Sequence, residues 1–600
     1  MLPAPPSPPV SPGVRNPSTS TILVPVFSPP TPAPSPRPLS PTTAPQKHPH
    51  YPLSFNRDVL PSFVRLSAAQ RREFITQLLA ACDVDQLVHA NALIQPLLKR
   101  DFLRELPLEV SLLVLSFVED AQTLARAAQV SKFWQALLAD DAAWKRMCEQ
   151  SKYGSPKSAK PVAPYRSIDD LKRSMRKLSM TASPALARQS VHQIHFKRRH
   201  LTERNWARGG RLLETHTLPD EGVITSVAMD DEWIVVGLAN YQIHVFSVQT
   251  GRQVRTLLGH TLGVWTLGLV SKGGVMRGPG TTGADAQVTP GALRGFEQAD
   301  SPRAVSSDVC NASAGWGQIG SIVVSGGCDR DVRVWDATTG NCLHTLQGHT
   351  STIRCLKVLD NRPVAVSGSR DTTVRVWDIA RGRLINTLQG HTDSVRCLEV
   401  SGHLVVSGSY DTTCRLWNVD TGECLKVFRG HHHEVYSVAF DGEKIVTGSL
   451  DAQVRIWSAS TGECIALHQG HTSLVGQIQL LGNTLVTGGS DGRVILYNTA
   501  SLDTNHRLSA HDNSVTCLQF DERYVISGGS DGCVKMYDMK TGQFVREMTA
   551  PCEAVWRVCF KEDLNVIMCR RAGRTVIEIW TFQPTDEQLG LQARSSAGKR

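Results

Sequence analysis

Apolar and polar residues recur along the C-terminal two thirds of the chain in units of about 40 residues. Each unit ends on an aromatic residue that follows an aspartate by six positions, and these residues are Trp335, Trp377, Trp417, Trp457, Tyr497 and Tyr537. A histidine separates successive units, and all but the last follow a glycine, at His260, His349, His391, His431, His471 and His511. A fixed period of this length indicates one small supersecondary unit per repeat, with neighbouring units stacked on one another.

This repeat resembles the WD40 repeat, in which each unit forms one four-stranded blade of a β-propeller. The resemblance covers about residues 217–582 and implies an all-β propeller of eight blades. The end blades depart from the pattern. Blade 1 has Asn240 in place of the turn aspartate, and blade 8 begins at Ala550-Pro551 without a Gly-His pair.

Blade 2 carries an insertion. Trp335 follows the equivalent Phe246 by 89 residues, which leaves about 49 residues over one period. The inserted segment, about 271–320, is rich in glycine, alanine and serine, so we expect a disordered loop that hangs near Trp265.

Two positions of the repeat stand out because a propeller aligns equivalent residues of its blades into rings around the central channel. The first ring lies five residues after each histidine, where the innermost strand begins, and the end blades complete it: Thr225, Trp265, Arg354, Arg396, Tyr436, Gly476, Thr516 and Trp556. The second ring directly precedes the turn position: Ala239, Cys328, Arg370, Tyr410, Leu450, Ser490 and Ser530. If the first strand leaves one face and the second returns to it, both rings lie on that face.

The two rings bring Arg354, Arg370 and Arg396 together from adjacent blades, with Trp265, Tyr410 and Tyr436 beside them. Guanidinium forks bind phosphate with two hydrogen bonds, and aromatic rings pack on proline. These residues therefore predict a site for a phosphorylated, proline-containing peptide. A single arginine is usually a solvated surface residue, which is what we expect of Arg333 and Arg375 on the next strand.

The recurrent histidine and aspartate suggest Ser/His/Asp catalysis, but a catalytic group is needed once and these recur in six units. We expect them to form a buried ladder of hydrogen bonds from His through Ser and Asp to Trp. The run His431 to His433 lacks cysteine or acidic partners at ligand spacing and is interpreted as loop residues rather than a metal site. We therefore expect no catalytic residue, no metal and no cofactor.

The net charge of +9 fits attraction to phosphorylated or acidic partners better than nucleic-acid binding, because no run of basic residues is long. The 15 cysteines include no CxxC pair, which argues for reduced thiols and against a zinc-binding RING. No segment has the 18 continuous apolar residues of a membrane span. We expect a soluble protein of the nucleus, the cytoplasm or both.

The first third of the chain contains four segments before the repeats. Residues 1–51 are expected to form a disordered tail, since the first 50 residues include 17 prolines and no acidic residue. Six Ser/Thr-Pro dipeptides in this tail are either proline-directed phosphorylation sites or chance products of its composition. Residues 52–100 show helical periodicity, with a serine cap at Ser67 and a second helix from about Asp83. Helices this short cannot bury a core alone, so we expect them to pack on a partner such as a second copy.

Residues 101–148 resemble an F-box. The resemblance rests on Leu106-Pro107, an apolar helix, the pair Phe133-Trp134 and the closing Trp144-Lys145. The residues that we expect to stay exposed as an adaptor-binding surface are Leu106, Pro107, Leu115, Val118 and Trp134. Residues 149–216 should form a helical linker, whose Lys197-Arg198-Arg199 is either a nuclear-import signal or a solvated helix face, and 583–600 a tail.

A helical dimerisation segment, an F-box and an eight-bladed propeller in this order resemble the F-box/WD40 substrate receptors of SCF ubiquitin ligases. The similarity is greatest to the branch of the budding-yeast cell-division-cycle receptor and the human receptor for phosphorylated cyclin E. It implies a non-catalytic, cell-cycle receptor that binds a Skp-type adaptor and cullin-RING ligase through the F-box, and a phosphodegron through Arg354, Arg370, Arg396 and Arg557 with Trp265, Tyr410 and Tyr436 as pocket walls. The alternatives are a propeller scaffold without ligase function, and another F-box/WD40 branch with a different degron.

Overall fold

The computed structural model describes residues 60–98, 101–138, 140–156, 191–218, 222–275 and 310–589. The chain divides into two units, Met1–Asp101 and Phe102–Arg600, which we describe separately. The predicted N-terminal tail with its Ser/Thr-Pro sites, most of the blade 2 insertion and most of the C-terminal tail lie outside the described residues.

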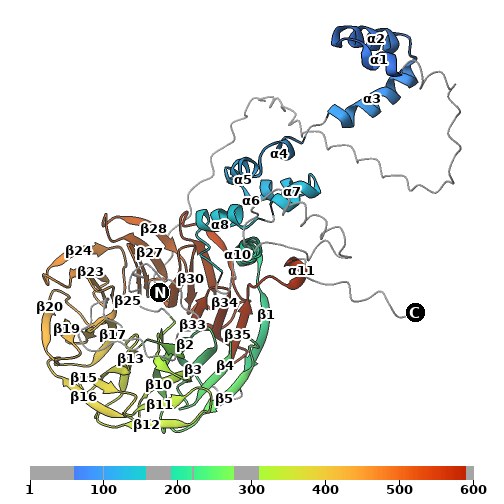
Figure 1. Ribbon diagram of the computed structural model, residues 1–600. Coiled ribbons are helices and arrows are strands. Elements are labelled where there is room, and N and C mark those ends of the chain that lie inside the picture. Colours follow the sequence, from blue (N-terminus) through green and yellow to red (C-terminus); the bar gives the residue numbers. More distant parts are fainter. Residues whose placement is uncertain are drawn as a thin grey trace, which may run out of the picture. The chain divides into compact units, whose positions relative to one another are not determined.

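The second unit contains the predicted eight-bladed propeller, which is thereby confirmed (Figure 1). Every blade contains four antiparallel strands with β2, β6, β13, β17, β21, β25, β29 or β33 innermost, and in blade 2 the short β8 (Ala312–Ser313) adds a fifth, parallel strand beside β6. The strands of blades 1 to 4 are β2 (Ile224–Met229), β3 (Trp233–Leu238), β4 (Ile243–Ser247) and β5 (Gln253–Leu257); β6 (Val264–Val270), β10 (Ile322–Gly327), β11 (Val332–Asp336) and β12 (Cys342–Leu346); β13 (Ile353–Val358), β14 (Val364–Ser369), β15 (Val374–Asp378) and β16 (Arg383–Leu388); and β17 (Val395–Ser401), β18 (Leu404–Ser409), β19 (Cys414–Asn418) and β20 (Cys424–Phe428).

Blades 5 to 7 repeat this arrangement, and blade 8 closes the ring with a strand from the beginning of the propeller. Their strands are β21 (Val435–Phe440), β22 (Lys444–Ser449), β23 (Gln453–Ser458) and β24 (Cys464–Gln469); β25 (Val475–Leu481), β26 (Thr484–Gly489), β27 (Arg493–Asn498) and β28 (Thr504–Ser509); β29 (Val515–Phe520), β30 (Tyr524–Gly529), β31 (Val534–Asp538) and β32 (Phe544–Glu547); and β33 (Ala554–Lys561), β34 (Leu564–Arg571) and β35 (Arg574–Thr581) with β1 (Arg211–Thr217). Because β1 pairs with β35, the two ends of the repeat region share one sheet and the ring has no open edge.

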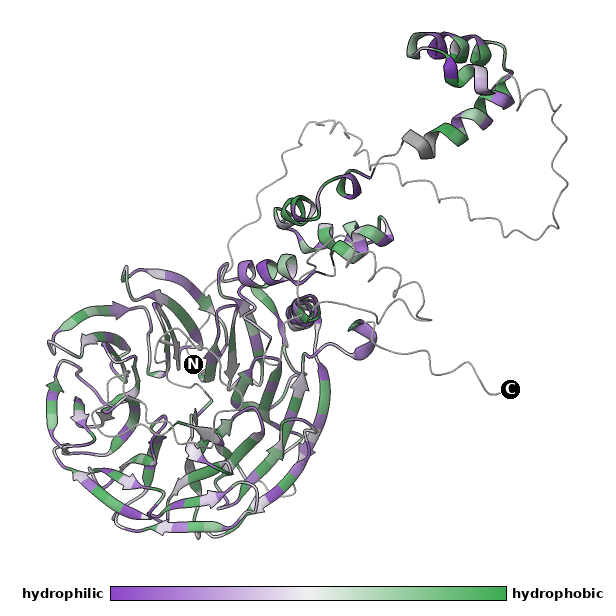
Figure 2. Cartoon of the chain, in the orientation of Figure 1, coloured by the Kyte–Doolittle hydropathy of each residue, from purple (hydrophilic) through white to green (hydrophobic). Residues whose placement is uncertain are grey.

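The periodic aromatic residues form the contacts between blades. Trp335 of blade 2 is buried with Val245 and Leu257 of blade 1, and Trp377 of blade 3 is buried against Val334 of blade 2. Apolar and polar residues alternate along the outer strands, as the colouring of Figure 2 shows, whereas inner strands such as β2 are buried throughout. Each tryptophan therefore seals the junction with the preceding blade, which explains why the sequence needs one per period.

The structure describes the two ends of the blade 2 insertion, residues 271–275 and 310–320. The insertion leaves at the far end of β6 from Trp265, because it joins the first strand of the blade to the second. It begins with β7 (Gly273–Gly274) and returns through β8 (Ala312–Ser313) and β9 (Trp316–Gln318). The two described ends of the insertion therefore lie about 20 Å from Trp265, at the other end of this strand. Residues 276–309 lie outside the described residues, so the expectation that the loop hangs near Trp265 stays a prediction.

The returning end of the insertion crosses the inner strands. Backbone N–H groups of Met229 in blade 1 and Leu269 in blade 2 donate to the carbonyls of Cys310 and Asn311, at 2.9 Å each. The Ser313 hydroxyl donates to the carbonyl of Val358 in blade 3 at 2.8 Å. We call residues 310–314 the strap; it ties three blades together on the face where the inner strands end.

Five short helices precede the propeller in the segment predicted as an F-box: α4 (Phe102–Glu105), α5 (Leu108–Ser116), α6 (Ala121–Ala127), α7 (Lys132–Leu137) and α8 (Asp141–Gln150). Asp120, Ser131 and Asp140 cap the last three through side-chain hydrogen bonds to backbone N–H groups. Pro107 is the N-cap of α5, and the buried Ser111 hydroxyl ties α5 to the Leu103 carbonyl at 2.7 Å.

Helix α10 (Val191–Arg208) joins these helices to the propeller and lies within the segment 149–216 that was predicted as a helical linker. At one end, Phe196 packs on Trp144 with ring centroids 5.8 Å apart. At the other, Trp206 is 1% exposed and stacks on Phe582 at 3.7 Å. Lys197 donates to the carbonyl of Leu589, the last residue of α11 (Asp586–Leu589).

The first unit contains α1 (Leu60–Arg65), α2 (Ala68–Ala80) and α3 (Val84–Leu98). The predicted cap is confirmed, because the Ser67 hydroxyl accepts from the Gln70 N–H and the Gln70 side chain accepts from the Ser67 N–H. Helix α2 has no buried residue, and Phe74, Ile75 and Leu78 are 40 to 54% exposed. In the described part of the chain, no helix is both long and apolar enough to span a membrane.

Candidate functional site

The inner strand of every blade carries a β-bulge near its beginning. The residue left out of the ladder is, blade by blade, Thr225, Trp265, Arg354, Arg396, Tyr436, Gly476, Thr516 and Trp556. These are the eight residues of the first ring identified in the sequence. A bulge bends the strand and redirects one side chain, so the side chains at these positions do not follow the regular alternation of the strand.

A recurrent backbone hydrogen bond places the second ring beside the first. In blade 3 the N–H of Arg370 donates to the carbonyl of Thr352, two residues before Arg354, at 2.9 Å. In blade 4 the N–H of Tyr410 donates in the same way to the carbonyl of Ser394 at 3.0 Å. Both rings therefore lie at the face where the inner strands begin. We call it the arginine face, and the other the opposite face.

The predicted hydrogen-bond ladder lies just beneath the arginine face. In blade 3 the Nδ1 of His349 is 2.7 Å from a carboxylate oxygen of Asp371, and its Nε2 is 2.8 Å from the Ser367 hydroxyl. That hydroxyl accepts from the Trp377 indole at 2.8 Å. Burial lowers the pKa of His349, so the ring is neutral: Nδ1 donates to Asp371 and Nε2 accepts from Ser367.

The aspartate of each ladder also fixes the turn that carries the second ring. Burial alone would raise the pKa of Asp371, but hydrogen bonds from His349 and Thr373 outweigh it and hold that pKa well below its usual value. Its carboxylate accepts from the N–H of Thr350 at 2.9 Å and of Thr373 at 3.0 Å. Arg370, which directly precedes Asp371, is therefore held by a rigid turn.

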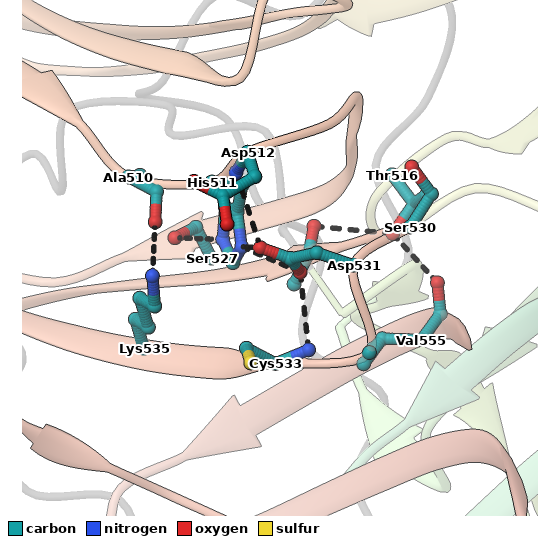
Figure 3. A network of polar contacts seen from close by, with 12 residues as sticks. Ala510, His511, Asp512, Thr516, Ser527, Ser530, Asp531, Cys533, Lys535 and Val555 are labelled. Atoms are coloured by element: carbon teal, nitrogen blue, oxygen red, sulfur yellow. Dashed lines mark hydrogen bonds and ion pairs between the residues drawn. The ribbon is translucent and has the colours of Figure 1, made fainter. Parts of the chain in front are cut away.

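Blade 7 shows the same ladder with one difference (Figure 3). His511 lies 3.0 Å from Asp531 and 2.9 Å from the Ser527 hydroxyl. Tyrosine replaces tryptophan here, and the Tyr537 hydroxyl lies 3.5 Å from the Ala510 carbonyl. The ladder recurs in six blades and supports loops, which confirms its structural interpretation.

The structure brings the predicted arginines and aromatic rings together in two groups. The Arg354 guanidinium lies over the Trp265 ring at 5.3 Å, and that of Arg396 lies over the Tyr436 ring at 5.7 Å. The rings of Tyr410 and Tyr436 are 5.2 Å apart. A hydrogen bond with Tyr410 and partial burial raise the pKa of Tyr436 to about 12, so the phenol is neutral and available as a donor at neutral pH.

The arginines of these groups carry uncompensated positive charge. Arg370 is exposed, and Arg354 and Arg396 are half-buried. Among the described residues, none of the three forms an ion pair with an acidic side chain. Guanidiniums on one face, stacked on aromatic rings and free of carboxylates, can bind an anionic group with short, charge-assisted hydrogen bonds.

Blade 8 contributes two more arginines, one predicted and one missed. The Arg557 guanidinium donates to the Thr225 carbonyl at 3.1 and 3.2 Å. Burial, and to a smaller extent the charge of Arg396, lower the pKa of Arg557. Arg570 follows the residue paired with Val555 and so occupies the second-ring position of blade 8. The sequence did not reveal Arg570, because blade 8 lacks the turn aspartate that marks this position elsewhere.

The expectation for the outer arginines needs correction. Arg375 is half-buried, and its guanidinium packs against Gly348 and beside Trp377. Its Nε is buried. The Arg333 side chain is 17% exposed and pairs with Asp331 at 3.4 Å. Both support the blade junctions rather than standing in water, because the third strand directs them over the tryptophan.

The F-box segment presents a different apolar surface from the one predicted. Leu115 is 4% exposed and belongs to the core of the helices, so its predicted place on an adaptor-binding surface is wrong. Leu106, Val118 and Trp134 are half-buried and pack against that core, while Pro107 is exposed. A binding role for these four stays a prediction.

Four exposed apolar residues of this segment form a stripe that the sequence analysis missed. Val110, Leu113 and Val114 of α5 and its C-cap residue Phe117 lie at helical spacing and are 40, 56, 40 and 67% exposed. We call these four residues the α5 stripe. The spacing of these residues was visible in the sequence. Most residues of α5 are apolar, however, and the face that packs inward is determined by α8, which is separated from α5 by 24 residues.

Histidines, cysteines and carboxylates form no group of three or more that could hold a metal ion within the described residues. His431, the first of the three consecutive histidines, pairs with Asp451 at 2.8 Å in its ladder, and His432 and His433 are exposed.

Family models match both parts of the second unit. An F-box-like model matches residues 103–150, and a model of the WD domain, G-beta repeat matches 340–378, 382–418, 422–458 and 503–538. Similar proteins include WD repeat-containing protein pop1 of Schizosaccharomyces pombe, 28% identical over half of this chain. F-box/WD repeat-containing protein 7 of Drosophila melanogaster is 35% identical over 34%, and a probable E3 ubiquitin ligase complex SCF subunit sconB of Arthroderma benhamiae is 29% identical over 32%.

The matches span less than a third of each of these relatives, at 31, 14 and 30% of their lengths. Among solved structures, a computationally designed protein, Ika8, aligns over 61% of this chain and 98% of its own at 28% identity and a TM-score of 0.49. The eight blades are established by the pairing of their strands.

Proposed function

The chain combines an F-box-like domain with WD40 repeats, as F-box/WD-repeat proteins do, and we propose that it is the non-catalytic substrate-recognition subunit of an SCF-type ubiquitin ligase. In this role the F-box binds a Skp-type adaptor and through it a cullin-RING ligase. The propeller binds phosphorylated Ser/Thr-Pro degrons and delivers the substrate for ubiquitin-dependent degradation.

The observation that carries the proposal is the set of uncompensated arginines on one face. Arg354, Arg370 and Arg396 project from adjacent blades beside aromatic rings and have no acidic partner among the described residues. Phosphate matches the planar guanidinium fork, and Trp265 and Tyr436 offer faces on which a following proline can pack. A doubly charged phosphate supplies the compensation that the face lacks.

The α5 stripe supports the adaptor half of the proposal. Four apolar side chains exposed on one helix face are typical of a protein interface, because water is displaced from all of them together when a partner covers the helix. The predicted Leu106, Pro107, Val118 and Trp134 would border this stripe or support it from below.

Dimerisation is a further part of the proposal. Helices α1 to α3 leave Phe74, Leu78 and Leu93 exposed, and α2 buries none of its residues. A second copy of this unit would cover these side chains. Light scattering on the chain with and without residues 52–100 tests it, and a monomeric mass for both would refute it.

The test of the proposed function uses a bead-bound Thr-Pro phosphopeptide and its unphosphorylated twin. The full chain mixed with a Skp-type adaptor should be retained, together with the adaptor, on the phosphopeptide alone. Replacing Leu113 and Phe117 with Asp should release the adaptor while the chain stays bound, since both residues are exposed and the fold does not depend on them. Retention of the chain without adaptor in the wild type would favour the rival function, a propeller scaffold.

A further inference from the structure

Glu434 stands on the arginine face but has the opposite charge. It directly precedes β21 and lies two residues before the bulged Tyr436. Its carbonyl accepts from the Leu450 N–H at 3.0 Å, which is the bond that joins the two rings in the other blades. The backbone of Glu434 is thus fixed at the edge of the proposed peptide site.

Glu434 differs from its counterparts in every other blade. The eight residues at this position, all within the described part of the chain, are Val223, Gly263, Thr352, Ser394, Glu434, Leu474, Ser514 and Ala554. Glu434 alone carries a charge. Its position is therefore not required by the blade architecture, which tolerates small, apolar or hydroxyl side chains there.

The carboxylate of Glu434 has no partner to match its charge. Its Oε2 atom is buried and accepts no hydrogen bond among the described residues. The negative charge of Glu434 helps to raise the pKa of Tyr436, whereas the positive charge of Arg396 acts against this rise. Glu434 lies two residues before Tyr436 and Arg396 lies over the Tyr436 ring, yet Glu434 and Arg396 form no ion pair with each other.

A buried carboxylate oxygen without a donor is unfavourable, because it has lost water and gained nothing in exchange. The fold could remove this cost with a neighbouring cation, but Arg396 is directed over the Tyr436 ring instead. A cationic side chain supplied by a bound peptide would satisfy Glu434 while the arginines hold the phosphate.

We propose that Glu434 makes the arginine face selective for phosphopeptides that carry a lysine or arginine beside the phosphorylated residue. Phosphate is bound from blades 3 and 4, and the cationic side chain of the same peptide reaches Glu434 at blade 5. This inference rests on the proposed function and narrows its substrate class to peptides with charges of both signs.

The experiment uses a family of phosphothreonine-proline peptides in which one lysine is moved through the flanking positions, each compared with its glutamine twin by fluorescence anisotropy. The wild-type chain should bind one lysine peptide about threefold to fivefold more tightly than its twin, the effect expected of one partly exposed ion pair. Glu434→Gln should abolish this preference and keep the dependence on phosphate. Glu443→Gln, an exposed glutamate at the other end of β21, should retain the preference.

Three results would overturn the inference. An equal lysine preference in the wild type and Glu434→Gln, or no preference at any position, would exclude a role of Glu434 in selection. A uniform gain in affinity of every phosphopeptide on Glu434→Gln would show that the carboxylate competes with phosphate for Arg396. Phosphate-independent binding by the wild type would refute the proposed function itself, and the inference with it.

Discussion

The two faces of the propeller are formed by opposite ends of the same inner strands, and they treat polar groups differently. On the arginine face, the guanidiniums of Arg354 and Arg396 stack on aromatic rings and have no acidic partner within the described part of the chain. Toward the opposite face, polar groups are paired between blades. Lys357 meets Glu399 at 3.2 Å, and the Gln519 amide accepts from the N–H of Phe560 at 2.8 Å and donates to its carbonyl at 2.5 Å.

We interpret this difference as a division between an end of the channel that stabilises the fold and an end that is proposed to bind a ligand. The strap adds to the pairing at the opposite face, where Asn311 donates to the Val227 carbonyl at 3.1 Å. Unpaired charges on the arginine face do not stabilise the folded state. We therefore interpret them as part of a ligand-binding site. Changes at the opposite face should alter folding, and changes at the arginine face should alter binding.

The largest effect should come from removing a clamp of the opposite face. Gln519→Ala leaves the buried N–H of Phe560 without a partner, at a cost of about 1 to 3 kcal/mol, and leaves its carbonyl with only the weak donor of the Cys310 thiol. The midpoint of urea unfolding should fall, while phosphopeptide affinity measured below the transition stays unchanged. Gln543→Ala, at an exposed position of blade 7, is the control. Loss of affinity in parallel with stability would show that the two faces are not independent.

Removing one guanidinium should weaken phosphopeptide binding and leave the stability of the fold unchanged. Arg396→Ala should weaken phosphopeptide binding at least about tenfold, because each charge-assisted hydrogen bond contributes about 1.5 to 3 kcal/mol. Arg396→Lys should be impaired as well, since lysine keeps the charge but lacks the planar fork. Arg429→Ala removes an exposed arginine at the rim of the same face, directly after β20, and should bind as the wild type does. Equal losses in Arg396→Ala and Arg429→Ala would point to a diffuse charge effect.

The sequence predicted the fold well, because the period of the repeat determines the architecture. The tryptophans and ladder histidines recur with the blades, and the spacing alone located six of the eight. Blade 8 was harder, since Glu578 replaces the ladder there: it bonds Thr549 at 2.8 Å and Arg571 at 2.5 Å. The strap was missed because a segment rich in small residues carries no periodic signal.

The candidate site was only partly accessible from sequence. The rings identified Arg354, Arg370 and Arg396, since register within a blade follows from the repeat. The burial of a side chain does not follow from its register in the repeat. Leu115 proved to be core, and Arg375 lies half-buried beside tryptophan, because neighbouring elements decide how much of a side chain is exposed.

Acid should affect the ladder before it affects the arginines. Burial lowers the pKa values of His349, His471 and His511 from the ordinary value of 6.5. Because the unfolded chain then binds protons more readily, the stabilisation is complete above pH 6.5 and is lost as the pH falls from there toward the folded values. The melting temperature should decrease between pH 7 and 5. His432→Gln, at an exposed histidine, should leave this decrease unchanged, and a stability independent of pH in this range would contradict neutral ladder histidines.

The smallest effect concerns the turn that follows Arg370. Thr372 has a φ of 72°, a left-handed conformation that β-branched residues rarely adopt. Thr372→Gly should relieve this strain and raise stability by less than about 1 kcal/mol, with phosphopeptide affinity unchanged. The matched change Thr421→Gly, in an exposed loop of blade 4 without positive φ, should lower stability. A loss of stability in Thr372→Gly would show that the turn is held by the side chain instead.

The central claim is that the arginine face binds phosphate, and calorimetric titration of the full chain with a Thr-Pro peptide in its phosphorylated and unphosphorylated forms tests it most directly. The phosphorylated form should bind at least about tenfold more tightly, and added inorganic phosphate should weaken it by competition at Arg354, Arg370 and Arg396. Equal affinity for the two forms would contradict the account.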